Sequence, residues 1–374
     1  MDKRVVHITG EQSCKLLRLA REGKVVSVAP APECAAQPLD STMRHLTDLG
    51  APSLLDALGV GPANPLEILV PSDKSRRWTQ GIKTKTLTTR LPEGSFFELL
   101  PGSSKKESIQ IPTDLRVLIE SPSLSIVRRA RVMEAFIAKS KLTRHIAMLR
   151  LLEFADECCG SYSRCPSDPR SGKIIYDKPG KCTRLITPKE LRSYIQELRG
   201  MKGIALARTV AQYAIDESGS PMESFFNHSL TLPPRFGGLS IATPLANKQL
   251  VMSDRIKPIL KHKSLRPDLQ WPKFHVLAEY LGDAEHSGKP SRVEDKRRMQ
   301  DYATAHYTAF PLMFDDVRNV AAIRVTAQMI ARELMKNGAT NELYRIRRIM
   351  KGESFQEKQT QLVATLLPPV TRFE

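Results

Sequence analysis

The stretch RPDLQWPKFHVLAEYLGDAEH, residues 266–286, constrains the fold more than any other part of the chain. Asp268 comes just before an aromatic-proline pair, and eleven residues later Glu279 follows a short apolar run, residues 276–278. Short apolar runs bounded by Pro and Gly are typical of β-strands. The spacing therefore predicts two adjacent strands, with Asp268 opening one and Glu279 on the other, so that the two carboxylates meet at the ladder.

A third acid and a charged helix accompany this hairpin. Glu223 lies in SGSPMES at the start of a predicted helix, and VEDKRRMQDY, residues 293–302, is predicted to be a helix that packs beside the hairpin. Acids that converge in this way bind Mg²⁺, and the ion polarises a scissile phosphate and makes a hydroxide from water. These residues are therefore a candidate site for metal-dependent hydrolysis.

Each of these residues also has a purely structural interpretation. Residues 220–223 form a capping box, so Glu223 is equally expected to bond the N-terminus of its own helix. Asp268 is compatible with a loop end that binds backbone amides, and Glu279 with the solvent face of an edge strand. His286 is more typical of a loop histidine than of a base. The sequence leaves both interpretations open.

The charge of the chain favours a polyanionic partner. Fifty-seven Lys and Arg oppose 40 Asp and Glu, which gives a net charge of +17. Each phosphate that a protein neutralises releases counterions, so such a surplus predicts contact with nucleic acid. Residues 123–150 are the most basic predicted helical stretch, with seven Lys or Arg and one Glu. They are expected either to contact phosphates or to form a solvated helix face.

No targeting or membrane segment is expected from the sequence. Arg18 and Glu11 interrupt the first twenty residues, and no uncharged apolar run approaches the ~18 residues of a membrane span. The expected location is the cytoplasm. The six cysteines do not have the spacing of a zinc site, and reduced, partly buried thiols are expected instead; they are Cys14, Cys34, Cys158, Cys159, Cys165 and Cys182.

The expected fold class is α/β of the mixed α+β kind, in several parts. Residues 1–64 are predicted to form a small helical unit, for which a winged helix is one alternative. Residues 65–186 are predicted to mix strands and helices, with a capping box at 187–190 opening the next helix. Residues 187–338 are predicted to hold a helix from Ser220, strands near 238–242, 267–281 and 307–314, and a last helix to Asn337. Residues 339–374 are expected to be a basic tail.

An ordered set of phrases resembles the PD-(D/E)XK, restriction-endonuclease-like superfamily, and within it the very-short-patch mismatch-repair endonucleases. The phrases in residues 187–330 are SGSPMES, LTLPPRFGGLSIATPLANKQL, RPDLQWP, AEYLGDAEHSG and EDKRRM. The phrases PLEILVPS, LPEGSFFEL, VLIESPSL and EFADECCGSY of the middle region resemble antitoxin-type regulators of type IV abortive-infection systems. The resemblance covers most of the chain and implies a restriction-endonuclease-like core preceded by an antitoxin-like region.

The resemblance implies roles for particular residues. Carried over position by position, the catalytic set is Glu223, Asp268, Glu279 and His286, and the metal ligands for Mg²⁺ or Mn²⁺ are Asp268 and Glu279, with Asp283 as a substitute ligand. The helix motif D-x-x-R is approximated by Asp295 with Arg298, and Arg297 precedes it. The predicted partner is double-stranded DNA, contacted by Arg128, Arg129, Arg131, Arg297 and Arg298. No membrane partner is expected, and a toxin partner is left open.

Leu281 departs from the family pattern. The residue two after the first strand acid is Asp or Lys in the family, and an aliphatic side chain can neither bind a metal nor orient water. Asp283 or Glu285 would substitute only if the strand ended in a bulge, which changes side-chain direction. Two functions follow from the sequence: a Mg²⁺-dependent DNA endonuclease, or a catalytically inactive, antitoxin-like DNA-binding regulator. A third alternative is an interaction protein without a nucleic-acid role.

Overall fold

The computed structural model describes residues 3–22, 25–38, 45–75, 81–104, 106, 108–164, 184–281 and 289–368. The chain divides into two compact units at residues 214 and 215. Both units combine helices with a mixed sheet, so the predicted α/β class is confirmed. None of the described helices is long and apolar enough to cross a bilayer.

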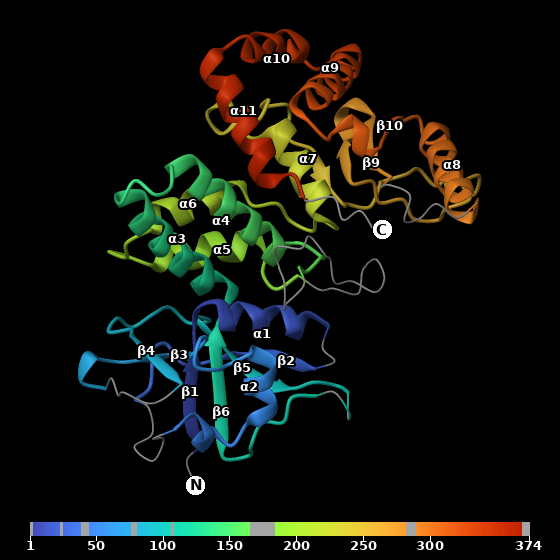
Figure 1. The fold of residues 1–374 in the computed structure, drawn as a ribbon. Coiled ribbons are helices and arrows are strands. Elements are labelled where there is room, and N and C mark those ends of the chain that lie inside the picture. Colours follow the sequence, from blue (N-terminus) through green and yellow to red (C-terminus); the bar gives the residue numbers. More distant parts are fainter. Residues whose placement is uncertain are drawn as a thin grey trace. The chain divides into compact units, whose positions relative to one another are not determined.

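The first unit is built on a six-stranded sheet. Its strand order is β2 (Val26–Ala31), β5 (Phe96–Pro101), β6 (Leu115–Glu120), β1 (Arg4–Ile8), β3 (Leu66–Val70) and β4 (Ile82–Thr86). The neighbours β1 and β6 are parallel, as are β3 and β4, and the remaining pairs are antiparallel. Figure 1 shows β1 and β6 side by side in the middle of the sheet.

Successive side chains along these strands point to opposite faces of the sheet, so that one face is apolar and the other is more polar. Val6 and Ile8 of β1, with Val117 and Ile119 of β6, belong to one core cluster. The same cluster takes in apolar residues of α1 (Gly10–Glu22) and α2 (Pro52–Leu58). This period of two explains why strands of only five or six residues are stable here, since every second side chain is removed from water.

Four further helices complete the first unit: α3 (Pro122–Ala138), α4 (Arg144–Cys159), α5 (Pro188–Glu197) and α6 (Ile204–Tyr213). The capping box predicted at 187–190 is confirmed, because Thr187 Oγ1 accepts from the Glu190 backbone N–H and the Glu190 carboxylate accepts from that of Thr187. The helix α6 begins so close to α3 that a Cβ on Gly203 would lie 2.5 Å from the Arg131 backbone nitrogen. Gly203 is therefore required for this packing.

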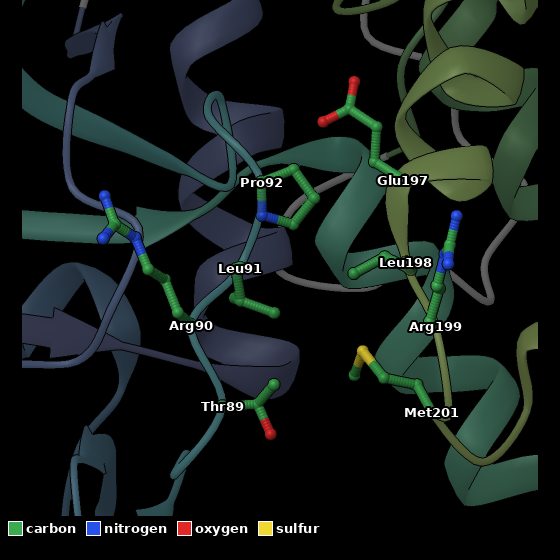
Figure 2. A pocket seen from close by; sticks show the side chains of 8 residues that line it. All are labelled: Thr89, Arg90, Leu91, Pro92, Glu197, Leu198, Arg199 and Met201. Carbon is green, nitrogen blue, oxygen red and sulfur yellow. The ribbon is translucent and has the colours of Figure 1, made fainter.

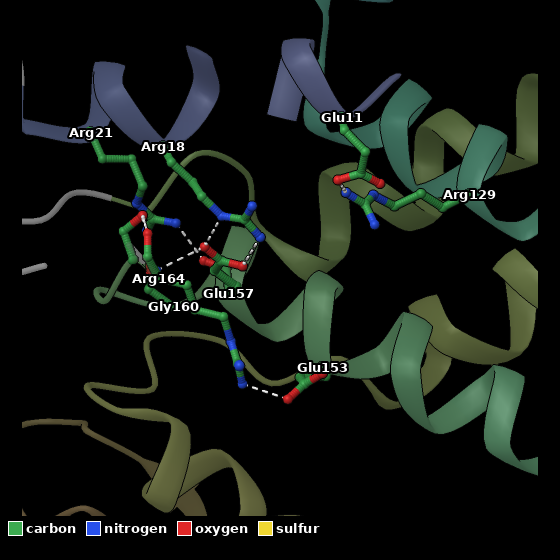
Figure 3. A network of polar contacts seen from close by, with 9 residues as sticks. Glu11, Arg18, Arg21, Arg129, Glu153, Glu157, Gly160 and Arg164 are labelled. Carbon is green, nitrogen blue, oxygen red and sulfur yellow. Dashed lines mark hydrogen bonds and ion pairs between the residues drawn. The ribbon is translucent and has the colours of Figure 1, made fainter. Parts of the chain in front are cut away.

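A buried ionic network ties α1 to the end of α4. Figure 3 shows Arg18 and Arg21 of α1 reaching Glu157 and Gly160. The guanidinium of Arg18 binds both carboxylate oxygens of Glu157, at 2.7 and 2.8 Å. Arg21 donates to the backbone carbonyls of Glu157 and Gly160. Buried charges are tolerated in this place because they are paired and hydrogen-bonded.

The second unit is built on a four-stranded sheet with the order β10 (Thr308–Leu312), β9 (Val276–Tyr280), β8 (Leu269–Trp271) and β7 (Leu245–Ala246). The first pair is parallel and the other pairs are antiparallel. In chain order α7 (Pro221–Thr231) precedes the three antiparallel strands, and α8 (Lys289–Thr304) connects β9 to β10. The unit ends with α9 (Val320–Lys336), α10 (Glu342–Met350) and α11 (Glu353–Leu366).

Short 3₁₀ helices lie between these elements, at Leu46–Leu49, Asp73–Ser75, Pro234–Phe236, Pro272–Phe274 and Phe314–Asp316. The helix predicted to begin at Ser220 and the helix predicted to end near Asn337 are confirmed, and each is capped: Ser220 and Asn319 accept backbone N–H groups at the N-termini of α7 and α9. The helical stretch predicted at 123–150 is interrupted at 139–143, where Ser140 adopts a φ of 53°.

The structure differs from the sequence prediction at three domain boundaries. Residues 1–64 are not a separate helical unit, because β1 and β2 pair with later strands in one sheet. The second unit begins at 215 rather than 187, because α5 and α6 belong to the first unit. The expected tail at 339–374 contains two amphipathic helices, α10 and α11, which bury their apolar residues.

The strand expected at 238–242 is irregular chain without a ladder partner.

Candidate active site in the second unit

Asp268 and Glu279 lie opposite each other at one end of the hairpin formed by β8 and β9. The register pairs Leu269 with Ala278, so the residues just before and just after this pair are Asp268 and Glu279. Each carboxylate bonds the other strand: the Asp268 backbone N–H donates to Glu279 Oε2 at 3.3 Å, and the Tyr280 N–H donates to Asp268 Oδ2 at 2.7 Å. The predicted adjacency of the two acids is confirmed.

Glu223 joins this pair from the first turn of α7. Its carboxylate accepts from the Gly219 backbone N–H at 2.7 Å and from the Asn247 side-chain amide at 2.6 Å, and Ser220 Oγ caps the helix by accepting from the Glu223 N–H. The capping interpretation of Glu223 is thus correct in part. The same carboxylate interacts electrostatically with Asp268 and Glu279, so its structural role and its place beside the other acids coexist.

All three carboxyl groups have a raised pKa. Burial raises the pKa of Asp268 well above its usual range, and the charges of Glu223 and Glu279 raise it further. Burial is also the main cause of the raised pKa of Glu223 and Glu279, and the Glu279 charge contributes at Glu223. Buried carboxylates that repel one another become stable by taking up a proton or a cation. A positive charge close to these acids therefore stabilises their ionised forms.

Arg298 and Tyr302 on α8 supply part of the compensation. The Arg298 guanidinium lies 2.6 Å from Glu279 Oε1, and the Tyr302 hydroxyl donates to Glu279 Oε2 at 3.2 Å. The side chain of Glu279 is 3% exposed, whereas that of Arg298 is 38% exposed. Arg298 thus reaches the acids from the solvent side, and it lowers the pKa of Glu279 against the effect of burial.

The donor atoms suit a hard divalent cation held by two carboxylates. Mg²⁺ prefers oxygen ligands, and it commonly uses one or two carboxylates while keeping several waters. Asp268 and Glu279 meet that description through their position and their excess negative charge. Among the residues that the structure describes, no three His, Cys, Asp or Glu side chains are gathered so that they could hold one ion. The predicted ligand Asp283 and the predicted catalytic residue His286 lie outside the described residues, as does Glu285.

Leu281 continues the ladder without a bulge. Its backbone N–H donates to the Leu312 carbonyl at 2.9 Å, directly after the unbroken pairing of β9 with β10. Side chains two residues apart on a strand share a face, so the half-buried Leu281 follows Glu279 on the same face. An aliphatic group therefore stands next to the acids, as the sequence had indicated.

The arginines predicted to contact DNA have different surroundings. Arg128 pairs with the buried Glu120 at 2.6 Å. Arg129 pairs with Glu11 at 2.6 Å and lies over the Phe154 ring, so both arginines hold the first unit together. Arg131 is exposed on α3. Arg297 on α8 is exposed, with Glu294 3.7 Å away, and Arg298 binds Glu279.

Asn247 and Tyr302 bind the acids but were not identified from the sequence. Asn247 follows Glu223 by 24 residues, in a segment with no regular pattern, and no local signal connects the two. Tyr302 follows Arg298 by four residues, which puts both on one face of a helix. That spacing was the signal available for Tyr302.

A separate pocket in the first unit has no comparable chemistry. It has a volume of about 320 Å³ and is lined by residues 89–92 and by residues 197–199 with Met201. Figure 2 shows Leu198 extending toward the segment that carries Leu91, while the side chain of Arg90 points away. Glu197 is the one acid in this lining, so no set of acids converges there.

Comparison with known proteins adds distant relatives. Two curated proteins of Mycobacterium tuberculosis, from strain CDC 1551 / Oshkosh and strain ATCC 25618 / H37Rv, are each 29% identical to the chain over 145 residues. The match covers 37% of this chain and 45% of each relative, so the chain spans about half the length of these relatives. Both are described as uncharacterized proteins. No family model and no solved structure matches the chain.

Proposed function

We propose that the second unit binds a divalent cation at Asp268 and Glu279 and hydrolyses phosphodiester bonds of double-stranded DNA. The observation that carries this proposal is that the half-buried acids Glu223 of α7 and Asp268 just before β8 interact electrostatically with the buried Glu279 of β9. The resemblance of the sequence to restriction-endonuclease-like proteins supports the same proposal.

The chain's own groups have distinct roles in this proposal. Asp268 and Glu279 hold the cation, which in such sites supplies polarisation of the scissile phosphate and activation of water. Glu223, oriented by Asn247 and the Gly219 N–H, adds negative charge that favours the cation. Arg298 approaches from the solvent side, where its guanidinium is suited to bind a phosphate oxygen.

A catalytically inactive DNA-binding regulator is the second candidate, and two observations favour it. Leu281 brings no polar group to the face that carries Glu279, and Arg298 already neutralises Glu279 through a 2.6 Å ion pair. In that case the acids serve the stability of the unit, and the positive charge of the chain serves binding alone.

Cleavage of supercoiled plasmid in Mg²⁺ or Mn²⁺ tests the proposal. The wild-type chain should nick the plasmid, and Asp268→Ala should reduce the rate by at least ~100-fold, because losing a metal ligand removes the ion. Asp254→Ala is the matched control, since Asp254 is an exposed acid that pairs with Lys257. An inactive wild type that binds DNA and gains activity with Leu281→Asp supports the second candidate. Cleavage that survives Asp268→Ala contradicts the assignment of the site.

A further inference from the structure

The helix α10 presents a stripe of four polar side chains on the face opposite its buried side. Leu343 and Ile346 are buried, and the Leu343 N–H contacts the Met335 sulfur of α9. The exposed stripe consists of Tyr344, Arg347, Arg348 and Lys351, which follow one another at positions i, i+3, i+4 and i+7. Side chains with this spacing lie on one side of a helix. The sequence had suggested only a basic tail in this region.

The stripe carries positive charge that nearby acids do not neutralise. Residues 320–351 contain seven Lys or Arg and two Glu. Each of these glutamates has a partner of its own: Glu333 pairs with Lys336 at 2.8 Å, and Glu342 pairs with Arg345. In the described part of the chain, no carboxylate forms an ion pair with Arg347, Arg348 or Lys351.

The stripe is also held in a fixed position. Arg347 Nε donates to Gln328 Oε1 of α9 at 3.3 Å, and the apolar side of α10 packs on the same helix. Tyr344 stands at the start of the stripe with 64% of its surface exposed, and its hydroxyl is available to donate a hydrogen bond. Cations on a packed helix lose less conformational freedom on binding than cations on a disordered tail.

We propose that this α10 stripe binds the phosphate backbone of duplex DNA. This inference rests on the proposed function of the second unit. From Arg347 to Lys351 the helix rises by ~6 Å along its axis. Successive phosphates of one DNA strand are spaced by ~3.4 Å along the axis of the duplex. Long basic side chains on one face can therefore reach successive phosphates. Arginine binds phosphate oxygens in a bidentate manner, and tyrosine hydroxyls are common phosphate donors.

The test compares two triple variants of the full chain that remove equal charge. The stripe variant is Arg347→Gln, Arg348→Gln and Lys351→Gln. The matched control is Arg199→Gln, Lys202→Gln and Arg208→Gln, three exposed cations at α5 and α6. Binding to a fluorescent duplex of mixed sequence is measured in EDTA from 50 to 200 mM salt, and circular dichroism checks that both variants fold.

The stripe variant should bind at least ~10-fold more weakly at 100 mM salt. The negative slope of log K against log salt should become shallower by about 2 to 3, which is about one for each lost phosphate contact. The control should change affinity less than ~2-fold and keep its slope. Equal losses in both variants, or an unchanged slope in the stripe variant, overturn the inference while leaving the proposed function intact.

Two further outcomes are distinguishable. A wild-type chain that does not bind duplex DNA at 50 mM salt contradicts both the DNA role and this inference. The same proteins are also mixed with vesicles of phosphatidylcholine and phosphatidylserine. If the stripe variant loses vesicle binding but keeps duplex binding, the surface belongs to a membrane and the inference is overturned.

Discussion

Both ring nitrogens of His7 are buried without a hydrogen-bond partner. The ring packs edge-on against Phe96 in the first unit, and burial followed by the charge of Arg116 lowers its pKa to about 4. A lowered histidine pKa means that the folded state binds fewer protons than the unfolded state. The free energy of unfolding should therefore fall as the pH drops from about 6.5 to about 4.

His7→Leu should remove this pH dependence. The wild-type first unit should lose about 3 kcal/mol between these pH values through His7 alone, and the variant should lose correspondingly less while being at least as stable at pH 7. Urea unfolding at pH 7 and pH 4.5 measures the difference. The control is His306→Asn, an exposed histidine with a φ of 62° that asparagine tolerates. Equal pH dependence in wild type and His7→Leu would disprove this role of His7.

At the scale of elements, the sequence predicted the hairpin and several helix starts well. The pattern around Asp268 and Glu279 is local, and so are the caps at Thr187 and Ser220. The strands β1 and β2 were missed because they are short and β2 contains Pro30, so their stability depends on distant partners in the sheet. Contacts such as Asn247 with Glu223 could not be predicted, because tertiary packing brings those residues together.

The network that joins α1 to α4 should make a large contribution to stability. Burial raises the pKa of Glu157, but the hydrogen bonds and charge of Arg18 outweigh it and hold the pKa below its usual range. Glu157→Gln leaves the buried Arg18 without its anion, so the free energy of unfolding should fall by about 3 kcal/mol. Glu134→Gln is the matched control in the same unit, because Glu134 also pairs with an arginine, Arg144, whose side chain is 59% exposed.

Urea unfolding followed by circular dichroism compares these two variants. Glu134→Gln should lower the free energy of unfolding by about 1 kcal/mol or less. If both substitutions have the same small effect, the bidentate pair between Arg18 and Glu157 does not hold α1 to α4.

At the scale of the whole molecule, the division at residue 215 predicts which fragments fold. The fragment 215–370 keeps the four-stranded sheet with the helices α7 to α11. It should be monodisperse and unfold cooperatively. The fragment 187–370, cut where the sequence had suggested a boundary, also carries α5 and α6, whose buried residues Leu191, Ile195, Leu206 and Val210 belong to the first unit.

Size-exclusion chromatography and thermal unfolding compare the two fragments. The longer fragment should aggregate more, because those apolar residues become exposed. A cooperative and monodisperse 187–370 together with an unfolded 215–370 would show that the second unit begins earlier in the chain.

The central claim is that Asp268 and Glu279 form a cation-binding pair, and thermal unfolding with and without Mg²⁺ tests it most directly. Because the pKa of Asp268 is raised in the folded state, ionisation of Asp268 costs stability, and that cost grows with pH from the pKa of the unfolded chain up to the raised pKa, above which it stays constant. Mg²⁺ should therefore raise the melting temperature of the wild-type second unit, and the rise should shrink in acid, where protons compete with the cation for the carboxylates.

Asp268→Asn keeps an oxygen that accepts from the Tyr280 N–H but removes the charge. It should melt at a higher temperature than wild type in EDTA and should not respond to Mg²⁺. Asp254→Asn, on an exposed loop, should respond as wild type does. A wild-type melting temperature that does not change with Mg²⁺, or an equal response in Asp268→Asn, would contradict the account.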